Sequence, residues 1–186
     1  MSALVGVFAG GASRRMGRDK ASLESPERAS ETLIERAVRV AREAGLEVVI
    51  VGDVRPELMP EVPRQVDRPR GIGPLGGLAA LLAEAGDRPA IALAVDMPYV
   101  RAEHLALLAS DRRDADVIAG RASEHAPWEP LCARYAPRAL PVIERAITEG
   151  ERSLQRVLAR LSVEVATLAP EVLRDWDTPD DLTRRH

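Results

Sequence analysis

The feature of the sequence that most limits its fold is the nearly continuous apolar run PAIALAV at residues 89–95, which stops at Asp96. A strand covered on both faces has such a run, whereas a strand with one solvated face alternates apolar and polar residues. A second run, ALVGVFA at residues 3–9, stops at Gly10. Two doubly buried strands indicate a sheet with helices on both faces, as in parallel α/β proteins.

The rest of the chain alternates between strand and helix patterns. Apolar residues at helical spacing begin at Leu33, with Ser30 as the expected N-cap and Gly45 as the expected stop. The βαβ units of the first half predict an α/β fold, a three-layer α/β/α sandwich with a mostly parallel sheet, in a single domain over residues 1–186. Strands are expected at 3–9, 47–51, 64–67, 89–95, 115–119, 129–135 and 163–168, and helices at 33–41, 75–85, 102–109, 138–148, 153–161 and after Pro179.

Composition argues against several classes of protein. The net charge of −3 lacks the basic excess of nucleic-acid-binding proteins, and no apolar run approaches the roughly 20 residues that span a bilayer. Because the chain also begins without a basic leader, we expect a cytoplasmic protein with no nucleic acid or membrane partner. Cys132 is the only cysteine and is expected to be buried, and the histidines at 104, 125 and 186 are too dispersed for a metal site.

The segment after the first predicted strand has the composition of an anion-binding loop. It reads GGASRRMGRDK from Gly10 to Lys20 and matches neither the dinucleotide motif GxGxxG nor the P-loop motif GxxxxGK[ST]. Adjacent glycines let backbone N–H groups approach phosphates, and the carboxyl end of a buried strand is where α/β sheets bind ligands. This position favours a triphosphate site over a solvated basic loop. The basic residues are Arg14, Arg15, Arg18 and Lys20.

The loop resembles the LAGGxSxRMGxDK signature of the MobA-like nucleotidyltransferases, with Phe8 in place of the usual leucine. Further segments resemble the family's motifs, in the family's order: GPLGGL at 73–78, DMPY at 96–99, EPL at 129–131 and DTPDDL at 177–182. The resemblance implies a Rossmann-like nucleotidyltransferase fold. It also implies the activity of a molybdenum cofactor guanylyltransferase, which transfers GMP from GTP to the phosphate of molybdopterin and releases pyrophosphate.

The resemblance also assigns site residues. Arg15, Lys20 and Asp96 would be catalytic, the two basic residues by neutralising charge on the phosphates. Asp96, at the carboxyl end of the most buried strand, would bind Mg²⁺, with Mn²⁺ as the alternative metal. Asp177 is the second metal candidate, although it also suits an N-cap before Pro179. The expected nucleotide-binding residues are Phe8, Ala9, Gly10, Gly11, Lys20, Asp67 and Asp96.

Two departures from the family pattern keep other functions open. Asp177 stands where guanylyltransferases often have asparagine and related cytidylyltransferases have aspartate. The family's usual polar residue at the end of the second strand corresponds here to Val51 or, one or two places on, to Gly52 or Asp53. Asp19 beside Lys20 and the GPLGGL turn favour the guanylyl branch. The alternatives are a molybdopterin cytidylyltransferase or another sugar-phosphate nucleotidyltransferase, and, in a different class, a non-catalytic nucleotide-sensing domain.

The expected partners are GTP and molybdopterin, together with molybdoenzymes or cofactor-insertion proteins that would receive the product. The pterin is expected to bind in the second half of the chain, where polar residues gather between predicted elements. These segments are residues 121–128 and the pair Arg152-Ser153.

Overall fold

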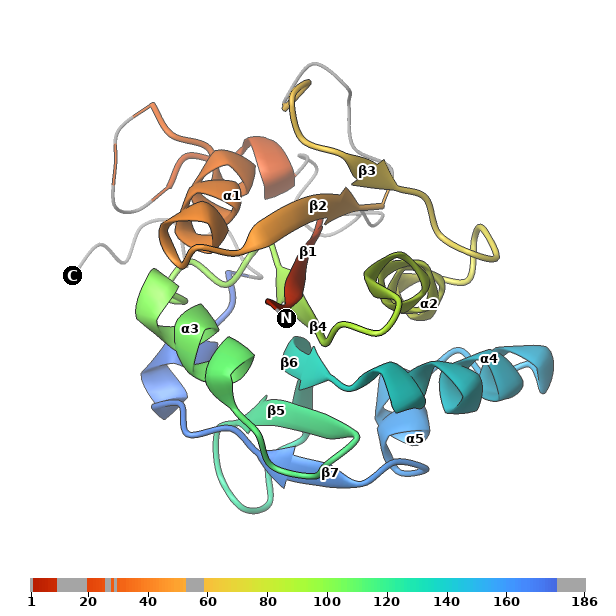
Figure 1. Cartoon of the computed structure of the whole chain (residues 1–186). Helices are drawn as coiled ribbons and strands as arrows, with labels where there is room; N and C mark the ends of the chain where they lie inside the picture. The colour runs from red at the N-terminus through yellow and green to blue at the C-terminus, as the bar shows by residue number, and fades with distance from the viewer. Residues whose placement is uncertain (1, 10–19, 26–27, 29, 53–58, 177–186) are drawn as a thin grey trace.

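One sheet forms the centre of the protein. The computed structural model describes residues 2–9, 20–25, 28, 30–52 and 59–176. Within them, the sheet has seven strands: β1 (Leu4–Phe8), β2 (Glu47–Val51), β3 (Arg64–Gln65), β4 (Ala90–Ala94), β5 (Val117–Arg121), β6 (Trp128–Tyr135) and β7 (Val163–Val165). Their order is β3-β2-β1-β4-β6-β5-β7, and among these strands β6 alone runs antiparallel to its neighbours (Figure 1).

Helices cover both faces of this sheet, with α1 and α3 on one face and α2, α4 and α5 on the other (Figure 1). The helices are α1 (Leu33–Glu43), α2 (Pro74–Ala85), α3 (Ala102–Ser110), α4 (Leu140–Thr148) and α5 (Leu154–Leu158), with short 3-10 turns η1 (Lys20–Ser22), η3 (Pro137–Ala139) and η4 (Pro170–Leu173). None of the helices in the described residues has the length and apolar character needed to span a membrane. The predicted three-layer sandwich with a mostly parallel sheet is confirmed, while the predicted helix after Pro179 lies outside the described residues.

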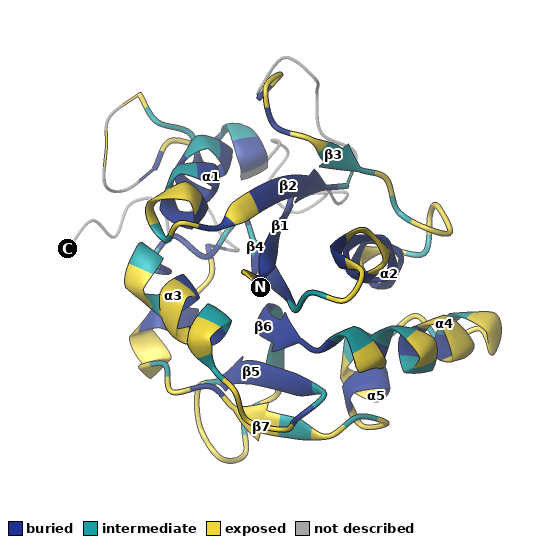
Figure 2. Ribbon diagram, in the orientation of Figure 1, coloured by how far each residue is buried: buried dark blue, intermediate teal, exposed yellow. Residues whose placement is uncertain are grey.

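Two separate cores flank the sheet, because successive side chains of a strand point to opposite faces. In β1, Val5 and Val7 join the core under α1 and α3, whereas Leu4 and Phe8 join the core under α2, α4 and α5. Figure 2 shows the central strands buried along their length. The continuous apolar runs of the sequence therefore correspond to double burial, as predicted.

The start of α1 differs from the prediction. Thr32 is the N-cap: its hydroxyl accepts from the Glu35 N–H at 3.4 Å, and the Glu35 carboxylate accepts from the Thr32 N–H at 2.7 Å. Ser30 does not cap the helix, since its φ of 74° is far from the extended backbone of an N-cap residue. The predicted stop is confirmed, because Gly45 follows the C-cap residue with a φ of 71°.

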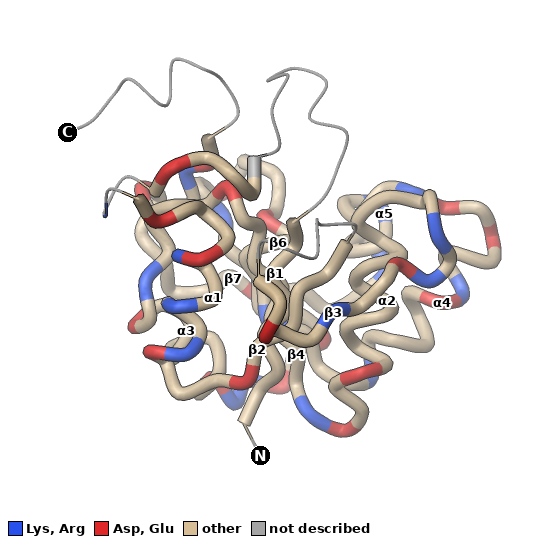
Figure 3. The backbone as a smooth tube through the Cα atoms, turned by 90° about the horizontal axis from the view of Figure 1, so that it is seen from above, with Lys and Arg blue, Asp and Glu red and all other residues tan. Residues whose placement is uncertain are grey.

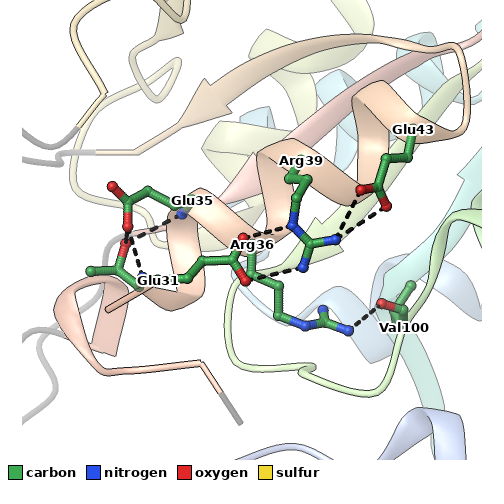
Figure 4. Close-up of polar contacts among 7 residues, drawn as sticks. Glu31, Glu35, Arg36, Arg39, Glu43 and Val100 are labelled. Carbon is green, nitrogen blue, oxygen red and sulfur yellow. Dashed lines mark hydrogen bonds and ion pairs between the residues drawn. The ribbon is translucent and has the colours of Figure 1, made fainter. Parts of the chain in front are cut away.

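Arginines on α1 connect it to its surroundings (Figure 4). Arg39 donates to the carboxylate of Glu31 at 2.6 and 3.0 Å and to that of Glu43 at 3.1 Å. Arg36 is buried, and its Nη2 donates to the Val100 carbonyl oxygen at 2.9 Å. This last bond fixes the turn that follows β4 against α1, and that turn contains one of the predicted site residues.

A histidine caps α3, and we expect it to make folding stability depend on pH. His104 Nδ1 accepts from the Arg101 N–H at 3.0 Å. Burial lowers the pKa of His104 below its ordinary value of 6.5, with Glu103 opposing the shift. The unfolded chain therefore takes up a proton at a higher pH than the folded chain does. The contribution of His104 is complete above about pH 6.5 and is lost as the pH falls through the lower pKa of the folded state.

Denaturant unfolding at several pH values between about 7 and 5 tests this expectation. The free energy of unfolding of the wild type should fall over this range, and His104→Asn, which keeps an acceptor but does not titrate, should show a smaller fall. The exposed His125 provides the control, since His125→Asn should behave as the wild type. An equal pH slope in the wild type and in His104→Asn would contradict the assignment.

Candidate functional site

The residues that follow the parallel strands are joined at one edge of the sheet by backbone hydrogen bonds. Each bond runs from the first residue after one strand to the last residue of the neighbouring strand. The carboxyl ends of β3, β2, β1 and β4 therefore lie side by side at this edge. Because ligands of α/β sheets bind outside this edge, the edge is the natural place for a site. The bonds run from the Gly52 N–H to the Gln65 carbonyl (3.1 Å), from the Ala9 N–H to the Val51 carbonyl (3.0 Å) and from the Val95 N–H to the Phe8 carbonyl (3.1 Å).

Asp96 lies at this edge, two residues beyond the end of β4, and is half-buried. Its carbonyl oxygen accepts a hydrogen bond from the Trp176 N–H at 2.9 Å. Trp176 is itself buried and packs into the core under α1 and α3, which anchors this part of the chain. Asp177 lies outside the described residues, but it directly follows Trp176 in the chain.

This arrangement fits a magnesium ion bound together with a nucleotide. Within the described ranges, no three His, Cys, Asp or Glu side chains gather into a ready-made metal site. Mg²⁺ commonly uses one or two carboxylates and completes its shell with waters and substrate phosphates. Among the described residues, the Asp96 carboxylate at this edge is one hard oxygen ligand of the kind that such a site uses.

Two glycines at the start of α2 make room for Asp67, which is half-buried just beyond β3. A Cβ atom on Gly77 would lie 3.2 Å from Asp67 Oδ1, 3.0 Å from Phe8 Cε1 and 2.7 Å from Val51 Cγ1. A Cβ atom on Gly76 would lie 2.6 Å from the Pro69 carbonyl oxygen. The GPLGGL segment therefore lets the first turn of α2 approach β1, β2 and the carboxylate of Asp67.

Substitution of Gly77 by alanine should reveal this close approach. In an open helix position the change stabilises a protein by roughly 1 kcal/mol, because alanine loses less backbone entropy. Here the added methyl meets the side chains of Val51 and Phe8, and overpacking of this kind costs about 1–3 kcal/mol. We expect a lower denaturation midpoint with an unchanged m-value. A midpoint above that of the wild type would show that the neighbours yield without strain.

The nucleotide-binding candidates near β1 and β2 contribute in different ways. The side chain of Phe8 packs in the core beneath α2, and Ala9 is fully buried on the α1 side. Val51 is also buried, so its side chain cannot read a base at the edge. The polar groups near these positions are the half-buried Asp67 carboxylate and the backbone after β2, where Gly52 has a φ of 110°.

The glycine-rich loop is described only at its end. Gly10, Gly11 and Arg15 lie outside the described residues. Lys20 is the first residue of η1, and the next residue, Ala21, is buried in the core under α1 and α3. The end of the loop is thus anchored on the α1 side of the site edge.

The two segments predicted to hold the pterin meet at the beginning of β6. Arg121, the last residue of β5, pairs in register with Trp128, the first residue of β6. The guanidinium carbon of Arg121 lies 4.5 Å from the centroid of the Trp128 ring. Gln155 of α5 donates to the Trp128 carbonyl oxygen at 2.6 Å, and Ser153 is the N-cap of α5. Residues 121–128 and the turn before α5 are therefore neighbours.

Glu151 organises the turn before α5. Its carboxylate accepts from the N–H groups of Arg152 at 2.7 Å and Ser153 at 2.8 Å, and from Arg156 Nε at 2.7 Å. The Arg156 bond, with these backbone N–H groups, lowers the pKa of Glu151 to about 2. The carboxylate is consequently charged at neutral pH and orients the backbone of this turn.

Cys132 is buried, as predicted, and burial raises the pKa of its thiol to about 12. A neutral, buried thiol is a poor nucleophile, so this residue is structural. Figure 3 shows positions of Lys and Arg and positions of Asp and Glu interspersed along the described backbone. The sequence did not reveal the roles of Arg36, Gly77 and Trp176 in positioning the site, because each of them acts through a contact with a distant segment of the chain.

Comparison with known proteins gives consistent matches. Residues 5–165 match the model of the MobA-like NTP transferase domain. The chain is 43% identical over 197 residues to a protein of Opitutus terrae named "Probable molybdenum cofactor guanylyltransferase", covering 98% of this chain and 95% of the relative. A protein of the same name from Nostoc is 35% identical, covering 95% and 86%. The crystal structure of molybdopterin-guanine dinucleotide biosynthesis protein A from Archaeoglobus fulgidus superposes with a TM-score of 0.77 at 29% identity, covering 98% and 96%.

Proposed function

The chain belongs to the family of MobA-like NTP transferase domains, and from this premise we propose that it transfers GMP from GTP to the phosphate of molybdopterin, releasing pyrophosphate. The observation that carries the proposal is the edge of the sheet, where Asp96, after β4, lies between Asp67, after β3, and the pair Arg121 and Trp128 of β5 and β6. The names of the relatives support both the guanylyl group and the pterin acceptor.

In this reaction a phosphate oxygen of molybdopterin attacks the α-phosphorus of GTP, and pyrophosphate leaves from the opposite side. The protein therefore contributes in-line positioning and neutralisation of charge, with no covalent intermediate on the chain. Arg15 and Lys20 would bind the phosphates, and the backbone of Gly10 and Gly11 would donate N–H groups to them.

The remaining roles belong to carboxylates. Asp96 and Asp177 would hold Mg²⁺, or Mn²⁺ as the alternative, which supplies positive charge beside the phosphates of the bound nucleotide. Asp67, kept close to the first turn of α2 by Gly76 and Gly77, would accept hydrogen bonds from the guanine or the ribose. The dinucleotide product would pass to molybdoenzymes or cofactor-insertion proteins.

Pyrophosphate release tests the proposal against its alternatives. The assay supplies molybdopterin and Mg²⁺ with GTP, CTP, ATP or UTP in turn and compares kcat/KM among the nucleotides. GTP should be preferred by about tenfold or more, because a site that hydrogen-bonds one base leaves polar groups unpaired with another. A preference for CTP would assign the protein to the cytidylyl branch that Asp177 suggests. Absence of release with all four would leave the non-catalytic nucleotide-sensing function.

A further inference from the structure

The sheet edge continues beyond Asp96 onto β6 and β5, which lie next to β4 (Figure 1). The pairing of β4 with β6 ends at Leu93 and Cys132, so Asp96, which follows β4, lies at the same edge of the sheet as the beginning of the antiparallel strand β6. β6 begins at Trp128, which pairs with Arg121, the last residue of β5. Arg121 and Trp128 are therefore on the side of Asp96 that faces away from Asp67. A ligand on this side would approach Asp96 from the direction opposite to the nucleoside.

The guanidinium of Arg121 is fixed in orientation by contacts within the protein. It stacks over the Trp128 ring, with 4.5 Å between the guanidinium carbon and the ring centroid. Its Nε donates to the Ala126 carbonyl oxygen at 2.7 Å, which closes the loop between β5 and β6. Trp128 is in turn held by the bond from Gln155 to its carbonyl oxygen. Stacking and the Nε bond together restrict the plane of the guanidinium.

The two terminal nitrogens of Arg121 are not used by these contacts. Neither Nη1 nor Nη2 has a hydrogen bond or an ion pair among the contacts of the described chain. Other arginines differ, since Arg113, Arg138 and Arg156 each bind carboxylates. Four N–H donors in a plane of preset orientation match the oxygens of a phosphate, which a guanidinium can bind with two parallel hydrogen bonds.

We propose that Arg121, braced by Trp128, binds the phosphate monoester of the acceptor. This inference rests on the proposed function and names the residue that holds its second substrate. In-line transfer requires the attacking phosphate to lie across the α-phosphorus from the leaving pyrophosphate. Arg121 would hold that phosphate from the β5 side while leaving one of its oxygens free to attack. Arg121 is thus an acceptor-binding residue, and Trp128 is a positioning residue that acts through it.

Calorimetric titration of molybdopterin into the protein without nucleotide tests the assignment independently of transfer. Arg121→Ala should raise the dissociation constant about ten- to hundredfold, as expected for a lost hydrogen bond between charged groups. Arg121→Lys keeps the charge but loses the planar guanidinium that stacks on Trp128. Its dissociation constant should lie between those of Arg121→Ala and the wild type. Trp128→Leu should also weaken binding, because it removes the brace. The exposed Arg112, in the loop before β5 at the opposite end of that strand, gives the control Arg112→Ala, which should bind as the wild type.

The same variants should leave the KM for GTP within about twofold of the wild type, since the nucleoside side of the site is intact. Unchanged molybdopterin binding in both Arg121 variants, or no binding by the wild type, would overturn the assignment. An equal rise in the KM for GTP and in the KM for molybdopterin would also overturn the assignment, because Arg121 would then support the structure of the whole site and would not bind the acceptor specifically. A different outcome would contradict the proposed function alone. In that outcome the wild type binds molybdopterin, the Arg121 variants bind it more weakly, and the wild type nevertheless transfers no GMP.

Discussion

Asp96→Asn is expected to lower kcat/KM for transfer by on the order of 10³-fold, while the free energy of unfolding stays within about 1 kcal/mol of the wild type. Asp96 follows the buried strand β4, and its backbone is fixed by the bond to Trp176. A triphosphate at the same edge would be repelled by an uncompensated carboxylate, and a divalent cation between them turns this repulsion into attraction. Asparagine keeps the shape of the side chain and loses the charge.

Activity measured across a Mg²⁺ titration checks this prediction. The matched control is Asp87→Asn, because Asp87 is exposed and precedes the amino end of the same strand, at the other edge of the sheet. Asp177→Asn should have a smaller effect than Asp96→Asn, since the asparagine carbonyl can still ligate a cation. If Asp96→Asn retained wild-type activity at low Mg²⁺, Asp96 would be a structural residue of the turn after β4.

Lys20→Ala is expected to lower turnover by about 10²-fold or more, on the scale of removing one group that stabilises charge in a transition state. The prediction rests on the basic loop that ends at Lys20 and on the buried neighbour Ala21, which anchors that end. Lys20→Arg is the companion variant, because it keeps the charge and changes its geometry. Steady-state kinetics and thermal unfolding of both variants separate catalysis from stability. Rates of Lys20→Ala within threefold of the wild type, as an order-of-magnitude limit, would contradict the phosphate-binding role of the loop.

Much of the fold follows from local patterns in the sequence. The run at 47–51 predicts β2 with its observed bounds, and the run at 89–95 predicts β4 to within one residue at each end. A strand that is buried on both faces has a continuous apolar run in its sequence, and this run can be recognised without knowing which distant residues pack against it. The antiparallel insertion of β6 between β4 and β5 has no such local signal, because strand order depends on pairing between segments far apart in the chain.

The candidate site shows the same division. The end of β4 predicts that Asp96 lies at the sheet edge, and the structure confirms that position. The bond from Trp176 to Asp96 joins residues 80 positions apart in sequence, and the approach of Gly77 to Asp67 depends on how α2 packs. Neither contact leaves a periodic pattern in the sequence. The roles of Arg15, Gly10, Gly11 and Asp177 stay predictions, since these residues lie outside the described part of the chain.

The most direct test of guanylyl transfer is to follow the two ends of GTP separately. The wild-type protein is incubated with molybdopterin, Mg²⁺ and GTP labelled at either the α- or the γ-phosphate, and the products are separated and identified by mass. We predict that the α-label appears in a dinucleotide containing the pterin, while the γ-label appears in pyrophosphate in equal amount. Appearance of the α-label only in free GMP, or no labelled pterin product, would contradict the proposed function.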